Sequence, residues 1–586
     1  MVKQLVFCNT ELCVGCNRCV RNCPVETANI VTQDSDGHIK VDIAANSCIA
    51  CGECIDVCAH GARTYNDDLE RFLDDLRRGE QISVMIAPAI RANHDEPGRL
   101  IAWFRSLGAV KVHDVSLGAD LCIWAHIRYL QQHGNSPVIT QPCPAIVNYT
   151  LKYLPNLTKY LSPVHSPMAC SAVYMKQYEK INTPIAAISP CVAKSHEFES
   201  TGLIKYNITF ERLFRYMDEH GINLPAQPSD FDHYKCGLGS VFPTPGGLKE
   251  NIEYFLGDAF SIDRSEGKHV VYRKLNEYAS QEKNSLPDIF DVLNCDEGCN
   301  RGPASGNRSS TFQMNRAMDK ARRASAKGRN RNYYKSLHAK YDSMLQLNHF
   351  LRRYTQEPTH VNKLTNSDIE RAFALMNKNT EDKQKFDCSA CGSDTCLAMA
   401  RKIALNVNIP ENCMQKSREK SEAGQRIMTE LHKINIQNAD QIEEDVNKIK
   451  SAVDKVWSHI GLVNESVSGF SKAEKTINDI SLQINIIAIN ASIEAVRLGD
   501  SGKAFGVIAD EIRKLAQATK ATMTENSEVF ETAESTMGDM GNLFKQIADI
   551  VAAAHVNILE LNRVNHEESE NSLDLIGSES AELLNL

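Results

Sequence analysis

The stretch PIAAISPCVAKSHE, residues 184–197, runs from a short apolar segment directly into a cysteine. Its first part, Pro184–Ser189, has the length and composition of a buried β-strand. Two other stretches repeat this order, PVITQPCP at residues 137–144 and IFDVLNCDEGC at residues 289–299. Ligands gather at the carboxyl ends of parallel strands in open α/β sheets, so these cysteines are expected to meet there. The sequence predicts an α/β domain with four converging thiols: Cys143, Cys191, Cys295 and Cys299.

Two more strand-like segments, Ile82–Ala87 and Val110–Val115, extend the alternation of strands and helices over residues from about 78 to 315. A single cysteine is more often a small buried hydrophobe than a ligand. Four cysteines at strand ends favour instead the ligands of one 4Fe-4S cluster. Three further cysteines match no spacing and are interpreted as core or surface residues: Cys122, Cys170 and Cys236.

The N-terminal segment contains two similar cysteine runs, CVGCNRCVRNCP at residues 13–24 and CIACGECIDVCA at residues 48–59. In such a doubled run, the fourth cysteine of each half usually ligates the other cluster. One 4Fe-4S cluster is thus assigned to Cys13, Cys16, Cys19 and Cys58, and a second to Cys48, Cys51, Cys54 and Cys23. A pair of zinc knuckles is the alternative, although zinc sites seldom need a doubled four-cysteine run. Residues 1–66 resemble a bacterial two-cluster ferredoxin, with an α+β fold.

The three strand–cysteine loops resemble the signature segments of FeFe hydrogenases, and residues 86–89 and 118–121 also resemble segments of that family. The resemblance implies that residues 78–355 form a hydrogenase-like domain. In the family, the four cysteines hold a 4Fe-4S cluster, and one of them, here Cys299, bridges to a two-iron centre with carbon monoxide and cyanide ligands. Lys194 stands where the family has the lysine that contacts a cyanide, and Glu197 completes the C-x-x-K-x-x-E pattern. Pro88 belongs to the segment beside the cofactor.

The sequence departs from active hydrogenases at the proton path. Pro142 replaces the cysteine whose thiol passes protons, and residues 122–126 read CIWAH where the family has glutamates. Ser189 and Leu293 replace methionines beside the two-iron centre. A positioned proton relay contributes roughly 10²–10⁴-fold in rate, so fast turnover is not expected. These departures are typical of sensory members of the family, and whether the chain is an enzyme stays open.

A third cysteine cluster, C-x2-C-x4-C-x16-C, comprises Cys388, Cys391, Cys396 and Cys413. A helix over residues 397–405 would bring the fourth cysteine back to the first three. Residues 356–416 resemble a small single-cluster 4Fe-4S module, and a zinc site is the alternative because four thiolates suit either metal. Sixteen of the twenty cysteines are then assigned to four 4Fe-4S clusters.

Residues 417–586 have a heptad pattern, with apolar residues in steps of three and four from Ile442 to Phe470. The turn at Gly499–Gly502 predicts an antiparallel coiled-coil hairpin, all α-helical. Two helices alone would leave much of this apolar seam in water, so a homodimeric four-helix bundle is expected.

The tip of this hairpin reads QINIIAINASIEAVRLG at residues 483–499 and resembles the signalling tip of methyl-accepting chemotaxis receptors. The resemblance implies binding of a histidine kinase and its coupling protein. The matching contact positions are Glu494, Arg497, Asp500, Phe505 and Val507. Leu482 replaces a phenylalanine common at a trimer contact, which leaves assembly beyond the dimer open.

Composition sets the compartment and excludes some partners. The 586 residues include 42% hydrophobic residues, carry a net charge of −9, and contain no apolar run of the ~18–20 residues that a membrane helix needs. The N-terminus lacks a signal-peptide pattern, so a reducing cytoplasm and metal-bound rather than disulfide-bonded cysteines are expected. The basic stretch at residues 316–340 carries no nucleic-acid motif. Neither nucleic acid nor a membrane is expected as a partner.

These features together predict a cytoplasmic hydrogen or redox sensor whose hydrogenase-like input controls a chemoreceptor hairpin. One alternative is a slow FeFe hydrogenase that the coiled coil only localises. Another is an iron–sulfur redox sensor without the two-iron centre. A ferredoxin-type protein is the expected electron partner.

Overall fold

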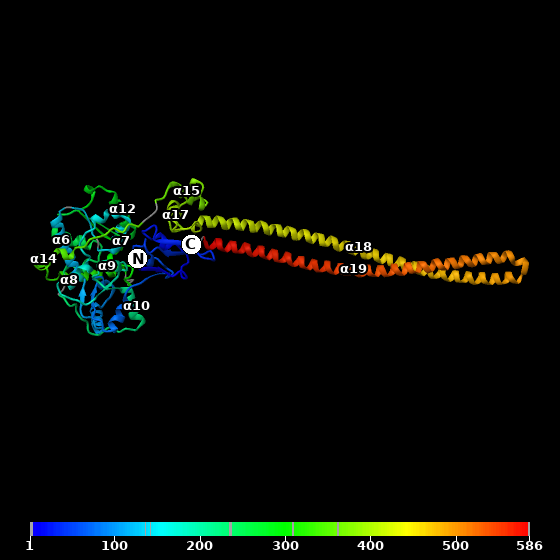
Figure 1. Ribbon diagram of the computed structural model, residues 1–586, viewed down its shortest axis with the longest axis horizontal. Helices are drawn as coiled ribbons and strands as arrows, with labels where there is room; N and C mark the ends of the chain where they lie inside the picture. The colour runs from blue at the N-terminus through cyan, green and yellow to red at the C-terminus, as the bar shows by residue number, and fades with distance from the viewer. Residues whose placement is uncertain are drawn as a thin grey trace. The chain divides into compact units, whose positions relative to one another are not determined.

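The computed structural model describes residues 4–583 except 135, 141, 234–236, 307–309 and 360–362, and describes side chains up to residue 564. The chain forms two compact units, Met1–Arg418 and Glu419–Leu586 (Figure 1). Within the described ranges, no helix is both long and apolar enough to cross a bilayer.

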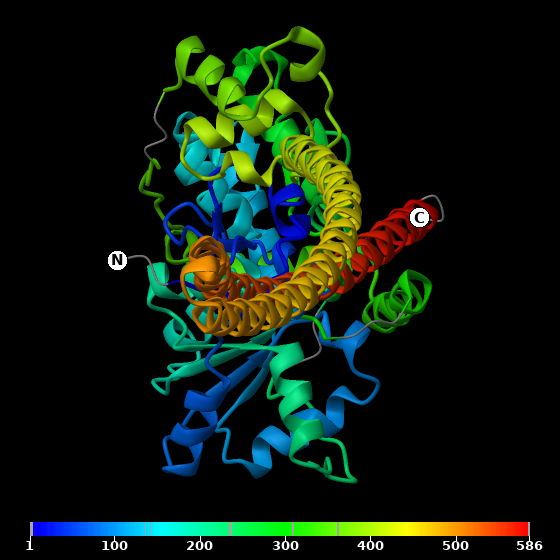
Figure 2. The same cartoon turned by 90° about the vertical axis from the view of Figure 1, so that its right-hand side faces the viewer.

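Two parallel sheets form the centre of the first unit, and together they contain the five strands predicted from the sequence. The four-stranded sheet has the order β6-β5-β8-β9, and the three-stranded sheet has the order β10-β11-β7. Figure 2 shows strands of the larger sheet with helices packed alongside. The strands are β5 (Ser83–Ile86), β6 (Val112–Asp114), β7 (Val138–Ile139), β8 (Ile185–Ser189), β9 (Tyr206–Thr209), β10 (Ile262–Glu266) and β11 (Ile289–Leu293). The α/β prediction is confirmed, although the strands divide between two sheets.

Helices bury the faces of these sheets. Phe72, Phe104, Met175 and Phe210, from four different helices, pack in one apolar core with β5 and β8. The helices of this region are α3 (Leu69–Arg77), α4 (Ile90–Asn93), α5 (Pro97–Ser106), α6 (Ser116–His133), α7 (Pro144–Tyr153), α8 (Pro167–Gln177), α9 (Lys194–Thr201), α10 (Phe210–Glu219), α11 (Gly247–Leu256), α12 (Lys268–Ser280), α13 (Thr311–Ala326) and α14 (Arg331–Met344). Several of them begin where the sequence marks a start: Pro144 and Pro167 occupy first-turn positions, and the Ser166 hydroxyl caps α8.

The N-terminal segment and the third cysteine cluster are small and contain little regular structure. The N-terminal part has two antiparallel strand pairs, β1 (Val6–Cys8) with β4 (Arg63–Tyr65) and β2 (Asn29–Gln33) with β3 (Ile39–Ile43), and two one-turn helices, α1 (Arg18–Arg21) and α2 (Glu53–Asp56). The third cluster lies among α15 (Asn366–Leu375), α16 (Glu381–Gln384) and α17 (Cys396–Ala404). The α+β prediction for residues 1–66 agrees with these elements.

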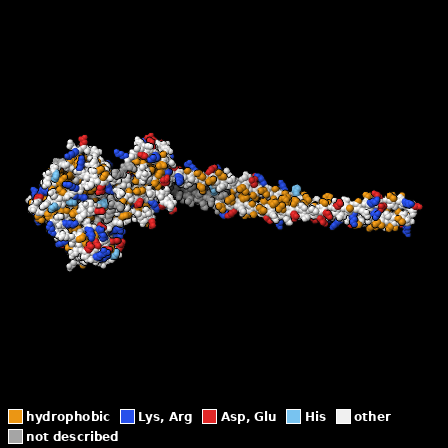
Figure 3. Space-filling view, in the orientation of Figure 1, with side chains coloured by type: hydrophobic (Ala, Val, Ile, Leu, Met, Phe, Trp, Pro, Cys, Tyr) orange, Lys and Arg blue, Asp and Glu red, His pale blue; other side chains and the backbone are white. Residues whose placement is uncertain are grey.

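The second unit is a hairpin of two very long helices, α18 (Met414–Arg497) and α19 (Lys503–Leu583), joined by the turn Gly499–Gly502. Most residues of one series spaced seven apart along α18 are buried between the arms, such as Val446, Val453 and Ile460. Other apolar residues of the same heptad seam stay exposed in a single chain: Ile449 is 48% exposed and Phe470 is 60% exposed. Figure 3 shows hydrophobic side chains along the surface of the hairpin.

The contact between α6 and α8 depends on a glycine. A Cβ added at Gly118 would lie 2.0 Å from the Pro167 carbonyl oxygen and 2.2 Å from the Ser171 hydroxyl. The Pro167 carbonyl belongs to the backbone of α8, so rotation of the Ser171 side chain alone would not make room. The close approach of the two helices therefore requires glycine at this position.

We expect Gly118→Ala to lower the free energy of unfolding of the first unit by about 1–3 kcal/mol, because overpacking displaces one helix. Urea titration followed by tryptophan fluorescence, to which the buried Trp124 of α6 contributes, measures the change. Gly424→Ala in α18 is the control, since a Cβ there meets nothing within 4 Å. Equal stability of the wild type and Gly118→Ala would contradict this account of the helix contact.

Candidate metal centres

The four cysteines at the strand ends come together from both sheets. Cys191 follows β8, Cys143 lies between β7 and α7, Cys295 follows β11, and Cys299 lies in the single turn Gly298–Arg301. Burial raises the pKa of Cys191 to about 11 and that of Cys299 to about 12, and the charge of Cys143 adds to both shifts. Four buried or half-buried thiols that repel one another as thiolates need a cationic centre to neutralise them. This donor set therefore fits the 4Fe-4S cluster that the sequence predicts here.

A small cavity of about 70 Å³ lies beside these thiols. Pro88, Lys194 and Cys299, the residues assigned to the two-iron centre, all line it, together with Cys191 and Ser189. The rest of the lining is apolar: Ala87, Ala89, Val115, Ala119, Pro142, Pro167, Met168, Pro190, Phe242, Pro243 and Leu293. A largely apolar cavity with two thiols and one ammonium group fits a compact anionic metal centre, to which Cys299 would supply a ligand and Lys194 a counter-charge.

Lys194 is held by three partners. Its ammonium group donates to Glu197 Oε2 at 2.5 Å, to Ser166 Oγ at 3.1 Å and to the Pro142 carbonyl at 3.2 Å. Burial lowers the pKa of Lys194, but the charge of Glu197 and the hydrogen bond to it outweigh burial, and the pKa is raised. Lys194 therefore presents a fixed positive charge to the cavity.

The cavity offers few groups for proton transfer. Pro142 lines it where a thiol would stand in an active hydrogenase, and its carbonyl is an acceptor only. His126 is not among the lining residues: its Nδ1 donates to the Cys122 carbonyl at 2.8 Å and its Nε2 lies 2.9 Å from Ser162 Oγ. Cys122 and Cys170 are buried core residues, as expected, and Cys236 lies outside the described residues.

The four cysteines assigned to the second N-terminal cluster line a common space. Cys23, from the first run, joins Cys48, Cys51 and Cys54 around a cavity of about 20 Å³. Burial raises the pKa of Cys23 to about 12, with the charge of Cys48 adding to the shift. The exchange of the fourth cysteine between the two runs is therefore compatible with the folded chain.

Asn294 connects this cluster site to the strand-end thiols. Its Nδ2 donates to the Cys51 carbonyl at 3.5 Å and to Cys295 Sγ at 3.7 Å, while its Oδ1 accepts from the Tyr272 hydroxyl at 2.6 Å. Pro303, in the loop after Cys299, packs on Gly52, where an added Cβ would lie only 2.4 Å from the proline ring. The two cluster sites are thus direct neighbours.

Arg63 is buried between the two N-terminal cluster sites. Its NH2 group donates to Cys19 Sγ at 3.3 Å, to Asn29 Oδ1 at 3.0 Å and to the Val41 carbonyl at 3.2 Å. The side chain is 5% exposed, and its NH1 group has no hydrogen-bond partner among the described residues. Cys13 and Cys16 act electrostatically on Cys19 in the same loop, and Cys58 is half-buried just after α2. No motif pointed to Arg63, because its role follows only from the folding of β4 against this loop.

The third cysteine cluster is docked on the N-terminal clusters. Asn17, between Cys16 and Cys19, donates to Asn412 Oδ1 at 2.7 Å, and Asn412 donates to the Cys391 carbonyl at 3.3 Å. The Val31 amide donates to the Val407 carbonyl at 3.0 Å. Lys402 is half-buried, and the charges of Cys23 and Cys391 both act on it.

The assigned ligands of this cluster lie together at the start of the long helix. Cys391, Cys396 and Cys413 are buried in one small core, and Cys388 is exposed beside them. Burial raises the pKa of Cys391, with the charges of Cys413 and Cys388 adding to the shift. Helix α18 begins at Met414, directly after the last of these cysteines.

The five residues assigned to kinase contact surround the turn of the hairpin and are exposed. Glu494 forms an ion pair with Arg497 at 3.5 Å, and Asp500 forms one with Lys503 at 2.7 Å. Phe505 is 70% exposed and Val507 71% exposed. Large apolar side chains in water at the end of a hairpin are typical of a protein contact site.

Family models match three parts of the chain. They describe a 4Fe-4S dicluster domain at residues 12–62, the C-terminal domain of the iron-only hydrogenase large subunit at residues 80–285, and a methyl-accepting chemotaxis protein signalling domain at residues 436–566.

Curated relatives fall into the same groups. The NADP-reducing hydrogenase subunit HndD of Solidesulfovibrio fructosivorans is 25% identical over 45% of this chain and 53% of its own. Iron hydrogenase 1 of Clostridium pasteurianum is 26% identical over 42% of this chain and 50% of its own. The methyl-accepting chemotaxis protein HlyB of Vibrio cholerae is 26% identical over 32% of this chain and 33% of its own. The chain thus spans about half or less of these relatives.

A solved FeFe-hydrogenase, from work on oxygen inactivation of the H cluster, covers 50% of this chain and 100% of its own, with 17% identity and a TM-score of 0.39. The family models and the curated relatives agree on which kinds of domain the chain contains. This protein joins a two-cluster iron–sulfur domain and an iron-only hydrogenase large-subunit domain to a methyl-accepting chemotaxis protein signalling domain.

Proposed function

We propose that this protein is a cytoplasmic hydrogen- or redox-responsive transducer, in which the hydrogenase-like input controls a hairpin that acts on a histidine kinase. The position of Cys413 carries this proposal, since the last assigned ligand of the third cluster directly precedes α18. A change of charge at that cluster would act on the first turn of α18. A change in the packing of this helix would then transmit the signal to the tip of the hairpin. The hairpin can respond only if two alternative packings of its helices interact differently with the oxidised and the reduced cluster.

The proposed functional units are residues 1–66, 78–355, 356–416 and 417–586. Their cofactors are four 4Fe-4S clusters on the sixteen assigned cysteines, and a two-iron centre in the apolar cavity. When bound, that centre would supply hydrogen binding and its reversible oxidation. Cys299 would ligate it, Lys194 would hold a positive charge against it, and the apolar lining would exclude water.

Contacts between neighbouring sites suggest the order of electron transfer. Asn294 joins the strand-end cluster site to the second N-terminal site, Arg63 lies between the two N-terminal sites, and the Asn17–Asn412 pair joins the first of them to the third cluster. Hydrogen bonds to cluster sulfurs and local charge set reduction potentials, so these residues would tune the route. The exposed loop around Cys16 is where a ferredoxin-type partner would exchange electrons.

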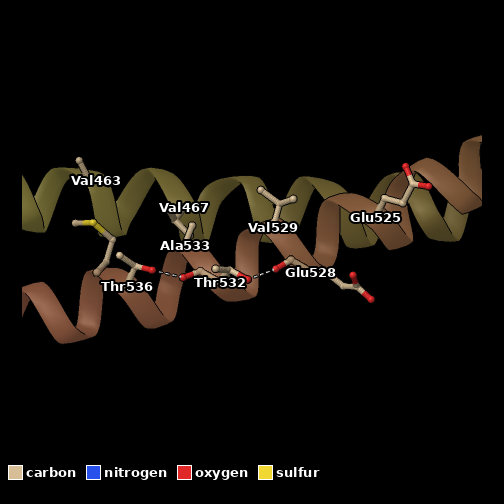
Figure 4. A pocket seen from close by; sticks show the side chains of 9 residues that line it. Val463, Val467, Glu525, Glu528, Val529, Thr532, Ala533 and Thr536 are labelled. Carbon is tan, nitrogen blue, oxygen red and sulfur yellow. Dashed lines mark hydrogen bonds between the residues drawn. The ribbon is translucent and has the colours of Figure 1, made fainter.

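The hairpin would work as a homodimer. A groove of about 630 Å³ runs between α18 and α19, lined by Val463, Val467, Val529 and Ala533 among others (Figure 4). Together with the exposed seam residues, this groove leaves a large apolar surface for a second hairpin to cover. The tip residues Glu494, Arg497, Asp500, Phe505 and Val507 would then contact the kinase and its coupling protein.

Two alternative functions are also compatible with the site residues. A slow hydrogenase that the hairpin only localises would still use Lys194 and Cys299, but Pro142 leaves its cavity without the proton-relay thiol. An iron–sulfur redox sensor without the two-iron centre would need only the cluster sites. Infrared spectra of protein matured with hydrogenase assembly factors separate these cases, because carbon monoxide and cyanide bands report the two-iron centre directly.

Kinase control tests the main proposal. We expect autophosphorylation of a chemotaxis histidine kinase, assembled with its coupling protein and the full chain, to differ between oxidised protein and protein reduced chemically or by hydrogen. Cys396→Ser should abolish the difference because it removes a ligand of the third cluster. Cys170→Ser is the matched control, since this buried thiol donates to the His165 carbonyl and a hydroxyl can do the same. Identical kinase activity in all redox states would refute a sensor role.

We expect Arg63→Met to lower the reduction potential of the first N-terminal cluster, because it removes a buried cation and a hydrogen bond to a ligand sulfur. Potentiometric titration followed by electron paramagnetic resonance measures the shift. Arg18→Met is the control: Arg18 lies in the same loop but is exposed, so water screens its charge. A shift no larger than that of the control would show that Arg63 does not tune this cluster.

We expect Pro142→Cys to raise the hydrogen evolution rate of the matured protein by roughly 10²–10⁴-fold, because it places a thiol in the wall of the cavity. Gas chromatography measures the rate, and Pro142→Ala separates loss of the proline from gain of the thiol. If infrared bands of the two-iron centre are present and the rate stays unchanged, the missing thiol is not what limits turnover.

A further inference from the structure

A second cavity, of about 380 Å³, is lined mainly by cationic and hydroxyl groups, among them Arg352, an ion-pair partner of Glu197. Lys176, Arg352 and Arg353 line it together with His165, His349 and Ser200. None of its lining residues within the described part of the chain carries a carboxylate. Its volume lies in the range of small-molecule sites, which is about 300–1,000 Å³.

The cations of this cavity have few partners. No hydrogen bond or ion pair of the Lys176 ammonium or the Arg353 guanidinium occurs among the described residues. Arg352 is 14% exposed, donates from NH2 to Ser200 Oγ at 3.1 Å, and leaves its buried Nε without a described partner. Its NH1 lies 4.0 Å from Glu197 Oε1, which is too far for a hydrogen bond. An arginine with free donors in a cationic cavity is suited to a phosphate or carboxylate group.

We propose that this cavity binds a small multivalent anion carrying phosphate or carboxylate groups, held by Lys176, Arg352 and Arg353. The Ser200 hydroxyl already accepts from Arg352 and orients its guanidinium group. Two cations, Lys194 and Arg352, share the carboxylate of Glu197. Glu199 and Glu357 line a neighbouring cavity with Arg352 and Arg353, so the anion would add its negative charge on the side whose lining has no carboxylate.

Binding of the anion would also change the electrostatic field in the metal cavity, a consequence that rests on the proposed function. An anion on Arg352 competes with Glu197 for the guanidinium group and leaves Glu197 paired with Lys194 alone. Lys194 lines the apolar cavity, so the electrostatic field there depends on whether the anion site is filled. The anion would therefore act as a second input beside the redox state.

Isothermal titration calorimetry of the full chain at low ionic strength tests the site. Inorganic phosphate, citrate and ADP are the probes, and chloride is the monovalent control. We expect one multivalent anion to bind per chain, with Lys176→Gln and Arg353→Gln each weakening it about tenfold through loss of a charged hydrogen bond. Preference among the probes distinguishes a free phosphate, a polycarboxylate and a nucleotide as the source of the anion.

The control variant is Lys320→Gln, which removes an exposed lysine of α13 outside the cavity and should leave affinity unchanged. Glu197→Gln should tighten binding, because it removes the carboxylate that competes for Arg352. Absence of binding by all three multivalent probes, or equal affinity in Lys176→Gln, Arg353→Gln and the wild type, would overturn the proposal. Neither result depends on the redox state or on kinase control, so this test and that of the proposed function fail separately.

Discussion

Repulsion among buried thiols is the constraint on which the first unit depends. Its cysteine groups lie in small apolar spaces, where burial raises the pKa of thiols such as Cys23, Cys191 and Cys299. Iron can neutralise such thiolates where neighbouring cations are few. The polypeptide around the metal sites is short of regular structure, and β7 has only two residues. Much of its stability would come from metal binding, as in other small metal-binding domains.

The polar residues that accompany the thiols have one property in common: each bridges two segments far apart in sequence. Asn294 connects the end of β11 to the Cys51 loop, Arg63 connects β4 to the Cys19 loop, and Asn17 connects the first cysteine run to Asn412. A buried polar group is retained only when its partners are satisfied, so these bridges fix the relative placement of the cluster sites. The same contacts that hold the unit together would set distances and potentials along an electron route.

Three of the departures from active hydrogenases lie in the wall of one cavity. Pro142, Ser189 and Leu293 all line it, and Lys194 keeps its buried ion pair with Glu197. On the proposed function, a cavity that keeps its counter-charge but lacks the relay thiol would serve binding rather than turnover. Arg352 lines a second cavity and lies 4.0 Å from Glu197, so one carboxylate pairs with a cation from each cavity.

The sequence by itself determined the domain order, the strands that end in cysteines and the hairpin with its tip. These features are local: spacing, apolar runs and heptads depend only on neighbouring residues. The structure corrected only details, since α18 begins at Met414 and the strands divide between two sheets. Tertiary structure alone decided the placement of Arg63, Asn294 and Arg352, because each has a partner far away in the sequence. Cys19 is 44 residues from Arg63, Ser200 is 152 from Arg352, and Cys51 is 243 from Asn294. No local pattern encodes such contacts, which arise only when distant segments pack and a buried polar group must find a partner.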